Sequence, residues 1–160
     1  MDDLHNLLPA FNFSVSLYKT GGSDRNLIGN GGFAECSGLE LSADIREHNE
    51  GGNNNAVRRM LGRVKLQPLV LKRGMLVNQT QADGTLWTWM TTMLDGQLPF
   101  DRYDGHIDVF DRIGATSFAR WSFVRGLPSK LSGPTLNAKT GDIAIEELQI
   151  VHEGLRLEVK

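Results

Sequence analysis

Residues 39–46 alternate strictly between apolar and polar side chains, and this run constrains the fold more than any other part of the chain. A period of two is the repeat of a β-strand that has one face on a core and the other in water or in a water-filled channel. The apolar face consists of Leu39, Leu41, Ala43 and Ile45. The polar face consists of Glu40, Ser42, Asp44, Arg46 and His48.

An Asn- and Gly-rich segment follows this strand. Residues 49–55 favour turns and contain no apolar anchor, so we predict a long loop that ends near Gly62. The chain then returns as a strand over residues 64–72. Pro68 lacks a backbone donor and therefore marks a bulge or an edge position within it.

The remaining pattern is mainly β. Residues 11–18 alternate with a period of two, and further strands are predicted over 106–111, 117–131, 142–152 and 155–159. The 117–131 strand is expected to break near Gly126 and Pro128. Together these segments predict one domain over residues 1–160, a mainly β, antiparallel β-sandwich or barrel with one flanking α-helix.

The one convincing helix is predicted over residues 83–94. Its apolar residues fall at helical spacing, Trp87 and Trp89 are expected to pack in the core, and Gly96 can end the helix. Asp83 or Thr85 can cap its start. The predicted buried positions are Leu86, Met90, Met93 and Leu94, with Trp89 beside them.

Composition limits the possible functions. The formal net charge of −2 gives no sign of a broad basic face for nucleic acid, and the one cysteine, Cys36, cannot form an intramolecular disulfide. We expect Cys36 to be a half-buried strand residue. Residues 1–10 do not resemble a secretory signal and no run approaches about 18 apolar residues, so we expect folding in the cytoplasm and no membrane span.

No motif indicates catalysis. None of the four histidines lies at metal-ligand spacing with another His or Cys, and the chain lacks a nucleophile elbow and a phosphate-binding loop. We therefore predict no catalytic residue, no metal and no cofactor. The basic cluster of Arg58, Arg59, Arg63 and Lys65 could meet phosphates, but intersubunit salt bridges are the preferred interpretation. A monomeric β-barrel that binds a ligand, or an enzyme of unknown type, is the alternative.

Six short blocks, in order along residues 11–157, resemble the tail-tube proteins of contractile phages and of extracellular contractile injection systems. The most distinctive block is Glu47–Asn54, which resembles the family's E-x-x-E-G-G-N-N loop. The others are F-x-E-x-S-G-L at 33–39, L-K-R-G at 71–74, G-P-x-L-x-A at 133–138, I-E-E-L at 145–148 and H-E-G-L at 152–155, and Trp121 matches a strand tryptophan.

The resemblance implies a fold shared with the ring protein of type VI secretion, and an assembly. Six subunits would form a ring around a channel, and rings would stack into the inner tube of a phage tail or of a contractile particle. The implied partners are copies of the chain, a contractile sheath protein, baseplate, spike and tube-terminating proteins, and cargo protein or DNA in the lumen. A tube-initiating or cap-adaptor subunit is the alternative within the family.

Site residues follow from the same resemblance. We predict that the lumen is lined by Glu40, Ser42, Asp44, Arg46, Lys65 and Gln67, while Leu39, Leu41, Ala43 and Ile45 pack inward against the helix. We also predict an N-terminal arm over residues 1–10 and an assembly loop over residues 47–62. The contact residues of the assembly loop are expected to be Glu47, Glu50, Gly51, Gly52, Asn53, Asn54, Arg58 and Arg59.

Overall fold

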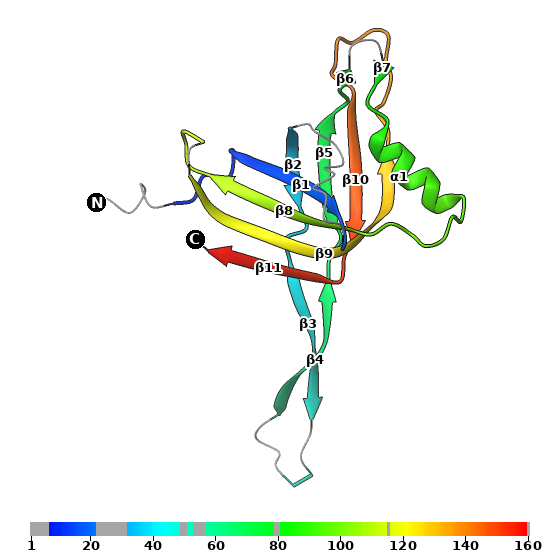
Figure 1. The fold of residues 1–160 in the computed structure, drawn as a ribbon. Helices are drawn as coiled ribbons and strands as arrows, with labels where there is room; N and C mark the ends of the chain where they lie inside the picture. Colours follow the sequence, from blue (N-terminus) through cyan, green and yellow to red (C-terminus); the bar gives the residue numbers. More distant parts are fainter. Residues whose placement is uncertain are drawn as a thin grey trace.

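The fold is organised by one long strand and the chain that returns along it. The structure is a computed structural model that describes residues 7–21, 32–48, 51–52, 57–78, 81–114 and 116–159. Strand β9 (Ser117–Ser132) pairs antiparallel with β10 (Ile145–Val151) and then with β11 (Gly154–Val159). β10 and β11 therefore act as one strand that follows β9 along nearly its whole length (Figure 1).

Four further strands complete two half-sheets. Half-sheet 1 is formed by β1 (Phe13–Lys19), β8 (Tyr103–Phe110), the first half of β9, and β11. Half-sheet 2 is formed by the second half of β9, β10, β5 (Leu69–Gly74) and β2 (Phe33–Ser37). All of these pairings are antiparallel, and β9 joins the two halves into one seven-stranded sheet.

The bend between the half-sheets lies at Arg125 and Gly126. Arg125 has a positive φ of 54°, which is uncommon for a non-glycine residue. A Cβ atom at position 126 would lie 2.8 Å from Cγ2 of Ile150, so only glycine fits without displacing that side chain. β9 thus bends without breaking, whereas we had predicted an interruption near Gly126 and Pro128.

The core lies between the half-sheets and is closed by helix α1 (Thr85–Leu94). Leu86 and Trp89 are its buried residues, and Leu94, predicted to be buried, is 73% exposed at the end of the helix. Gly96, with a φ of +71°, ends α1 as predicted. The buried cluster includes Leu17, Phe33, Leu69, Leu71, Leu86, Trp89, Ile107, Phe123, Leu148, Ile150 and Leu155.

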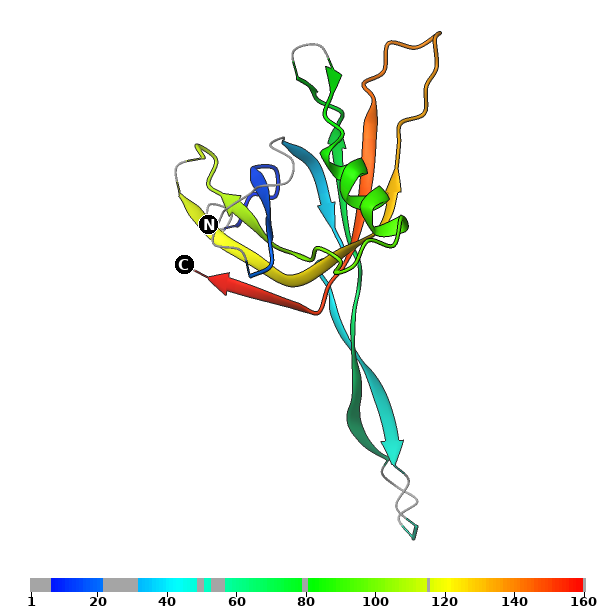
Figure 2. The same ribbon diagram turned by 45° about the vertical axis from the view of Figure 1, so that its right-hand side comes forward.

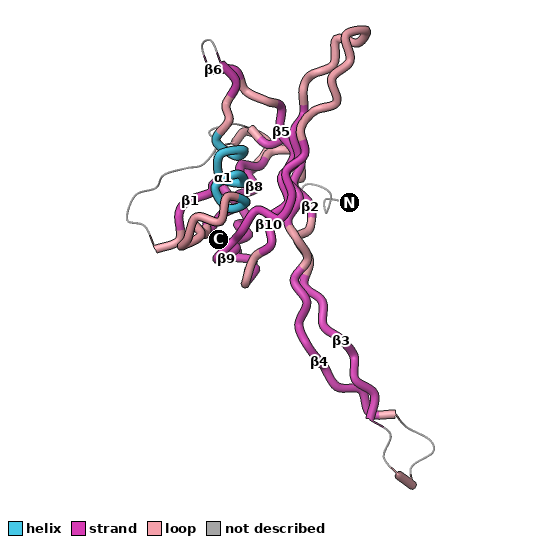
Figure 3. The backbone as a smooth tube through the Cα atoms, turned by 90° about the vertical axis from the view of Figure 1, so that its right-hand side faces the viewer, coloured by secondary structure: helices cyan, strands magenta, loops and turns pink. Residues whose placement is uncertain are grey.

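A two-stranded hairpin projects from one end of this body. β3 (Leu41–His48) pairs with β4 (Arg58–Leu66), and this pairing continues the register of β2 with β5 (Figures 1 and 3). The short strands β6 (Val77–Asn78) and β7 (Gln81–Ala82), and the segment 133–144, project from the opposite end (Figure 2). No helix in the described ranges has the length and apolar character that crossing a membrane requires.

The hairpin corrects two predictions. Residues 58–62, expected in a loop, belong to strand β4, in which 58–61 pair directly with β3, and β4 ends at Leu66 before Pro68. The apolar face of residues 39–45 does not pack as a whole on this chain's own core: Leu39 does so, but Leu41 and Ile45 are exposed. Glu50, Asn53 and Asn54 lie outside the described residues.

Candidate assembly surfaces

The β3–β4 hairpin carries an apolar face that nothing in the described chain covers. Residues directly opposite in an antiparallel pair share a face, so Leu41 with Leu66, Ala43 with Val64, and Ile45 with Leu61 form one surface. The exposed fractions of its larger members are 59% for Leu41, 64% for Ile45, 82% for Leu61 and 64% for Val64. A contiguous apolar strip of this kind is typical of a protein interface.

A register shift keeps this strip continuous. Between Ala43 and Ile45 the pairing slips by one residue, so Gly62 and Arg63 of β4 together oppose Asp44. Without this bulge the period of two would place Gly62, and not Leu61, on the apolar face. Gly62 suits the bulge because a Cβ atom there would lie 3.1 Å from the carbonyl oxygen of Asp44.

The opposite face of the hairpin holds most of the residues predicted to line a lumen. Ser42 faces Lys65 across the pair, and Lys65 Nζ lies 2.6 Å from Asp44 Oδ1. Arg46 lies on the same face, opposite Met60. Glu40 and Gln67, also predicted there, lie instead in the two links that join the hairpin to the body.

The predicted assembly residues gather at the far end of the hairpin. Glu47 and Arg59 are direct partners across the strands, and Arg59 Nε lies 3.3 Å from Glu47 Oε1. Arg58 lies opposite His48, and Gly51 and Gly52 form an exposed turn. Both charged partners of the ion pair are more than half exposed, so the pair contributes little to the stability of a single chain.

Half-sheet 2 has a polar outer face and two open edges. In the register of its four strands, Leu71 and Leu148 point inward, which places Lys72 and Glu147 outward. Among the described strands, β2 pairs only with β5, and the second half of β9 only with β10. The outward residues are Glu35, Ser37, Val70, Lys72, Lys130, Ser132, Glu147 and Gln149.

Sequence reasoning missed this face because adjacent acids give no sign of which one points inward. The structure buries Glu146 beside Arg73 and leaves Glu147 on the outer face. Lys72 Nζ lies 3.1 Å from Glu35 Oε2, and Gln149 donates to Glu147 at 3.1 Å. With Lys130, the face carries equal numbers of acidic and basic side chains.

The end of the body opposite the hairpin holds a shallow groove. Its volume is about 400 Å³, and it is lined by residues that include Lys72, Pro134, Asp142, Ile143, Ile145 and Glu147. Its two isoleucines are strongly exposed, Ile143 at 78% and Ile145 at 51%. The molecule therefore carries one apolar surface at each end.

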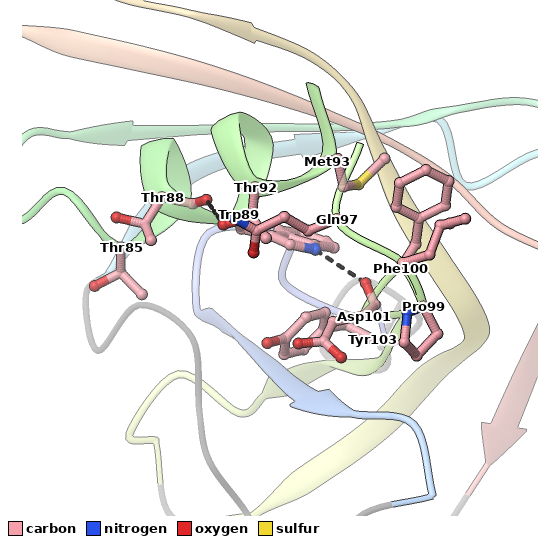
Figure 4. A pocket seen from close by; sticks show the side chains of 11 residues that line it. Thr85, Thr88, Trp89, Thr92, Met93, Gln97, Pro99, Phe100, Asp101 and Tyr103 are labelled. Carbon is pink, nitrogen blue, oxygen red and sulfur yellow. Dashed lines mark hydrogen bonds between the residues drawn. The ribbon is translucent and has the colours of Figure 1, made fainter. Parts of the chain in front are cut away.

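A second cavity of about 520 Å³ lies between α1 and the segment that follows it (Figure 4). The Trp89 indole N–H donates to the carbonyl of Asp101 at 3.1 Å, and the Trp89 and Tyr103 rings meet edge to face. Burial, followed by the negative charge of Asp101, raises the pKa of Tyr103. The lining combines threonines with these rings and holds no arrangement of nucleophile and base.

Half-sheet 1 carries a chain of hydrogen bonds across four strands. The Tyr18 hydroxyl lies 2.9 Å from His106 Nε2, His106 Nδ1 lies 3.2 Å from Ser122 Oγ, and Ser122 donates to Glu158 at 2.9 Å. Because the Ser122 proton points to Glu158, His106 does not act as its base. Burial, followed by the positive charge of Arg120, lowers the pKa of His106.

The described residues hold no group of three or more His, Cys, Asp or Glu side chains placed to bind a metal ion. Cys36 is half-buried in β2, as predicted, and burial raises the pKa of its thiol to about 11. A thiol with this pKa is a poor nucleophile at neutral pH.

Solved structures with the same fold come from contractile machines. The chain is similar to a component of the PVC extracellular contractile injection system sheath-tube complex in the extended state, at 23% identity, over 96% of this chain and 93% of that one, with a TM-score of 0.77. It is also similar to a component of the anti-feeding prophage baseplate, at 18% identity, over 96% of each chain, with a TM-score of 0.78. A type six secretion system protein matches at 13% identity, over 94% of this chain and 84% of that one, with a TM-score of 0.57.

A comparison with curated proteins gives no match. The family model of the T4-like virus tail tube protein gp19 matches residues 9–156, which is nearly the whole chain. The motif resemblance noted in the sequence is thereby confirmed, as is the mainly β fold with one helix. The chain belongs to the T4-like virus tail tube protein family, a family of structural proteins and not of enzymes.

Proposed function

We propose that six copies of this chain close into a ring, and that rings stack into the inner tube of a contractile tail or injection particle. The observation that carries this proposal is half-sheet 2, a four-stranded sheet with a polar outer face and an open strand at each edge. Open edges attract further strands, and closure into a barrel removes them. In the ring, β2 of one copy lies beside the second half of β9 of the next.

The polar outer face of half-sheet 2 then surrounds the bore. Sixfold repetition turns Glu35, Lys72, Lys130 and Glu147 into rings of alternating charge. Because acidic and basic residues balance, such a wall stays hydrated without holding a polyanion tightly. This suits the passage of DNA or of a protein cargo.

The hairpin joins one ring to the next. Its apolar strip lies at one end of the molecule and the groove at 133–147 lies at the other, so contact between them is head to tail and repeats without closing. Arginines of the hairpin complement Asp142 and Glu147 of the groove. Covering each large apolar side chain of the strip contributes roughly 1.5–3 kcal/mol.

In this arrangement the polar face of the hairpin, with Ser42, Asp44, Arg46 and Lys65, extends the wall of the bore, and Glu40 and Gln67 lie at its base. Glu47, Arg58 and Arg59 lie at the contact with the next ring. The similar structures from sheath-tube, baseplate and cap complexes support a sheath, a baseplate and a tube-terminating protein as partners. A tube-initiating subunit is the alternative, and copy number in the particle distinguishes the two.

Disulfide trapping tests the ring. In a Cys36→Ala background, Ser37→Cys on β2 and Lys130→Cys on β9 should give a ladder of covalent species that ends at the hexamer after oxidation. A control that pairs Ser37→Cys with Arg156→Cys on β11 places the second thiol on half-sheet 1 and should give no ladder. Equal ladders from both pairs, or none from either, would contradict closure through these edges.

A further inference from the structure

The hairpin base, defined as residues 38–40 and 67–68, is a close contact between two backbone segments. Gly38 has a φ of +85°, and a Cβ atom at this position would lie 2.1 Å from the carbonyl oxygen of Pro68. Any side chain would therefore force the two links apart. The N–H of Glu40 donates to the carbonyl of Gly38 at 2.8 Å, which tightens the turn at this point.

A buried histidine reaches this base from the junction between β10 and β11. His152 is 9% exposed, and its Nε2 lies 3.1 Å from the carbonyl oxygen of Gln67. Its Nδ1 lies 3.1 Å from the carbonyl oxygen of Gly154. A neutral imidazole has one N–H, and in the tautomer that carries it on Nε2 the ring donates to Gln67 and so connects the hairpin base with the corner between β10 and β11.

The attachment point on the body is itself well fixed. The Glu153 N–H donates to the carbonyl of Val124 at 3.0 Å, and Arg125 Nε donates to Glu153 Oε2 at 2.7 Å. Arg102 Nη1 donates to Glu153 Oε1 at 2.9 Å. These contacts hold the corner where β10 passes into β11, next to the bend of β9.

We propose that His152 is a positioning residue that sets the direction of the β3–β4 hairpin relative to the body. Among the described residues, the base of the hairpin meets the body through the Gly38–Pro68 contact, the packing of Leu39 on the core and the His152–Gln67 contact, so the direction of the hairpin depends on these three contacts. Because the hairpin is long, a small change in its angle at the base moves its far end by a large distance. A second consequence rests on the proposed function: because the hairpin joins one ring to the next, His152 also determines how two rings meet.

Distances between two spin labels on the same copy of the chain measure this direction. In a Cys36→Ala, Leu61→Asp background, one pair of labels joins Arg46→Cys on β3 with Lys130→Cys on β9. A second pair, Lys130→Cys with Arg156→Cys, reports on the body alone. Adding His152→Leu should broaden or shift the first distance distribution and leave the second unchanged.

His106→Gln is the matched control, because His106 bonds to Tyr18 and Ser122, away from the hairpin base, and should change neither distribution. If His152→Leu does not fold, His152→Gln keeps one donor and should broaden the first distribution to a smaller extent. An unchanged hairpin distance in a folded His152 variant would overturn the proposal. Leu61→Asp removes the proposed stacking contact, and mixing the labelled chain with an excess of unlabelled chain leaves only distances within one copy, so this result does not depend on whether the wild-type protein forms rings or tubes.

Discussion

Arg73 on β5 and Glu146 on β10 are direct cross-strand partners, and each side chain is 1% exposed. Arg73 also contacts Asp83 at 3.2 Å, and the Trp87 indole N–H donates to the second oxygen of Glu146 at 3.1 Å. The ion pair thus joins half-sheet 2 to the start of α1. Thr85, which donates to Asp83, and Arg73 together lower the pKa of that carboxyl.

Removing one member of the Arg73–Glu146 ion pair should destabilise the folded chain. Glu146→Ala leaves the Arg73 charge buried beside a cavity, and we expect a loss of about 3–5 kcal/mol in the free energy of unfolding. The double variant Arg73→Met, Glu146→Leu should recover most of that loss, since no buried charge of the pair then lacks its partner. Urea denaturation measures both. The exposed Lys72–Glu35 pair, which joins β5 to β2, is the control, and Glu35→Ala should cost about 1 kcal/mol or less.

Leu61→Asp should separate folding from assembly. Leu61 is 82% exposed on the apolar strip, so the charge should leave the thermal unfolding of the monomer nearly unchanged. It should abolish sedimentable tubes, because stacking would bury the new carboxylate against apolar side chains. Ser42→Asp on the polar face is the matched control and should keep tubes. A Leu61→Asp protein that still forms normal tubes would rule out the strip as the stacking contact.

His106 should make the fold sensitive to acid. Its pKa in the folded chain is lowered by burial and by Arg120, so the unfolded chain takes up a proton at a higher pH than the folded chain does. The free energy of unfolding should therefore decrease as the pH falls through the ordinary histidine pKa of about 6.5. His106→Gln should show a smaller decrease in urea midpoint between neutral and mildly acidic pH. An identical decrease in both proteins would contradict this assignment.

Cys36 should resist alkylation in the native protein. With a pKa of about 11, roughly one thiol in a thousand is ionised at pH 8. Iodoacetamide should modify Cys36 slowly in buffer and rapidly in urea, where the thiol regains its ordinary pKa. Mass spectrometry of the intact chain follows the reaction. Equal rates in the two conditions would show that β2 opens at its edge.

The alternation at residues 39–46 predicted a strand with one covered face, but not which molecule covers it. A period of two reports only that one face is apolar, and in the single chain Leu41 and Ile45 remain exposed. The end of the loop was misplaced because the bulge at Gly62 and Arg63 interrupts the period in β4. The motif blocks identified the family, since they cover nearly the whole chain.

Other features depend on contacts that are distant in sequence. Glu146 and Glu147 are equivalent in a strand pattern, and only the register against Arg73 places one inside and the other outside. The contact between His152 and Gln67 joins residues 85 positions apart. The helix was predicted nearly to its ends because its stop at Gly96 is local, although its N-cap residue is Gly84 and Asp83, one residue earlier, accepts from the Thr85 N–H.

A cryo-EM reconstruction of particles formed by the purified protein tests the central claim most directly. We expect six copies per ring, with β2 beside the second half of β9 of the next copy and with Lys72 and Glu147 facing an open bore. A bore lined by the Tyr18–His106 face of half-sheet 1, or a protein that stays monomeric at every concentration, would contradict the account.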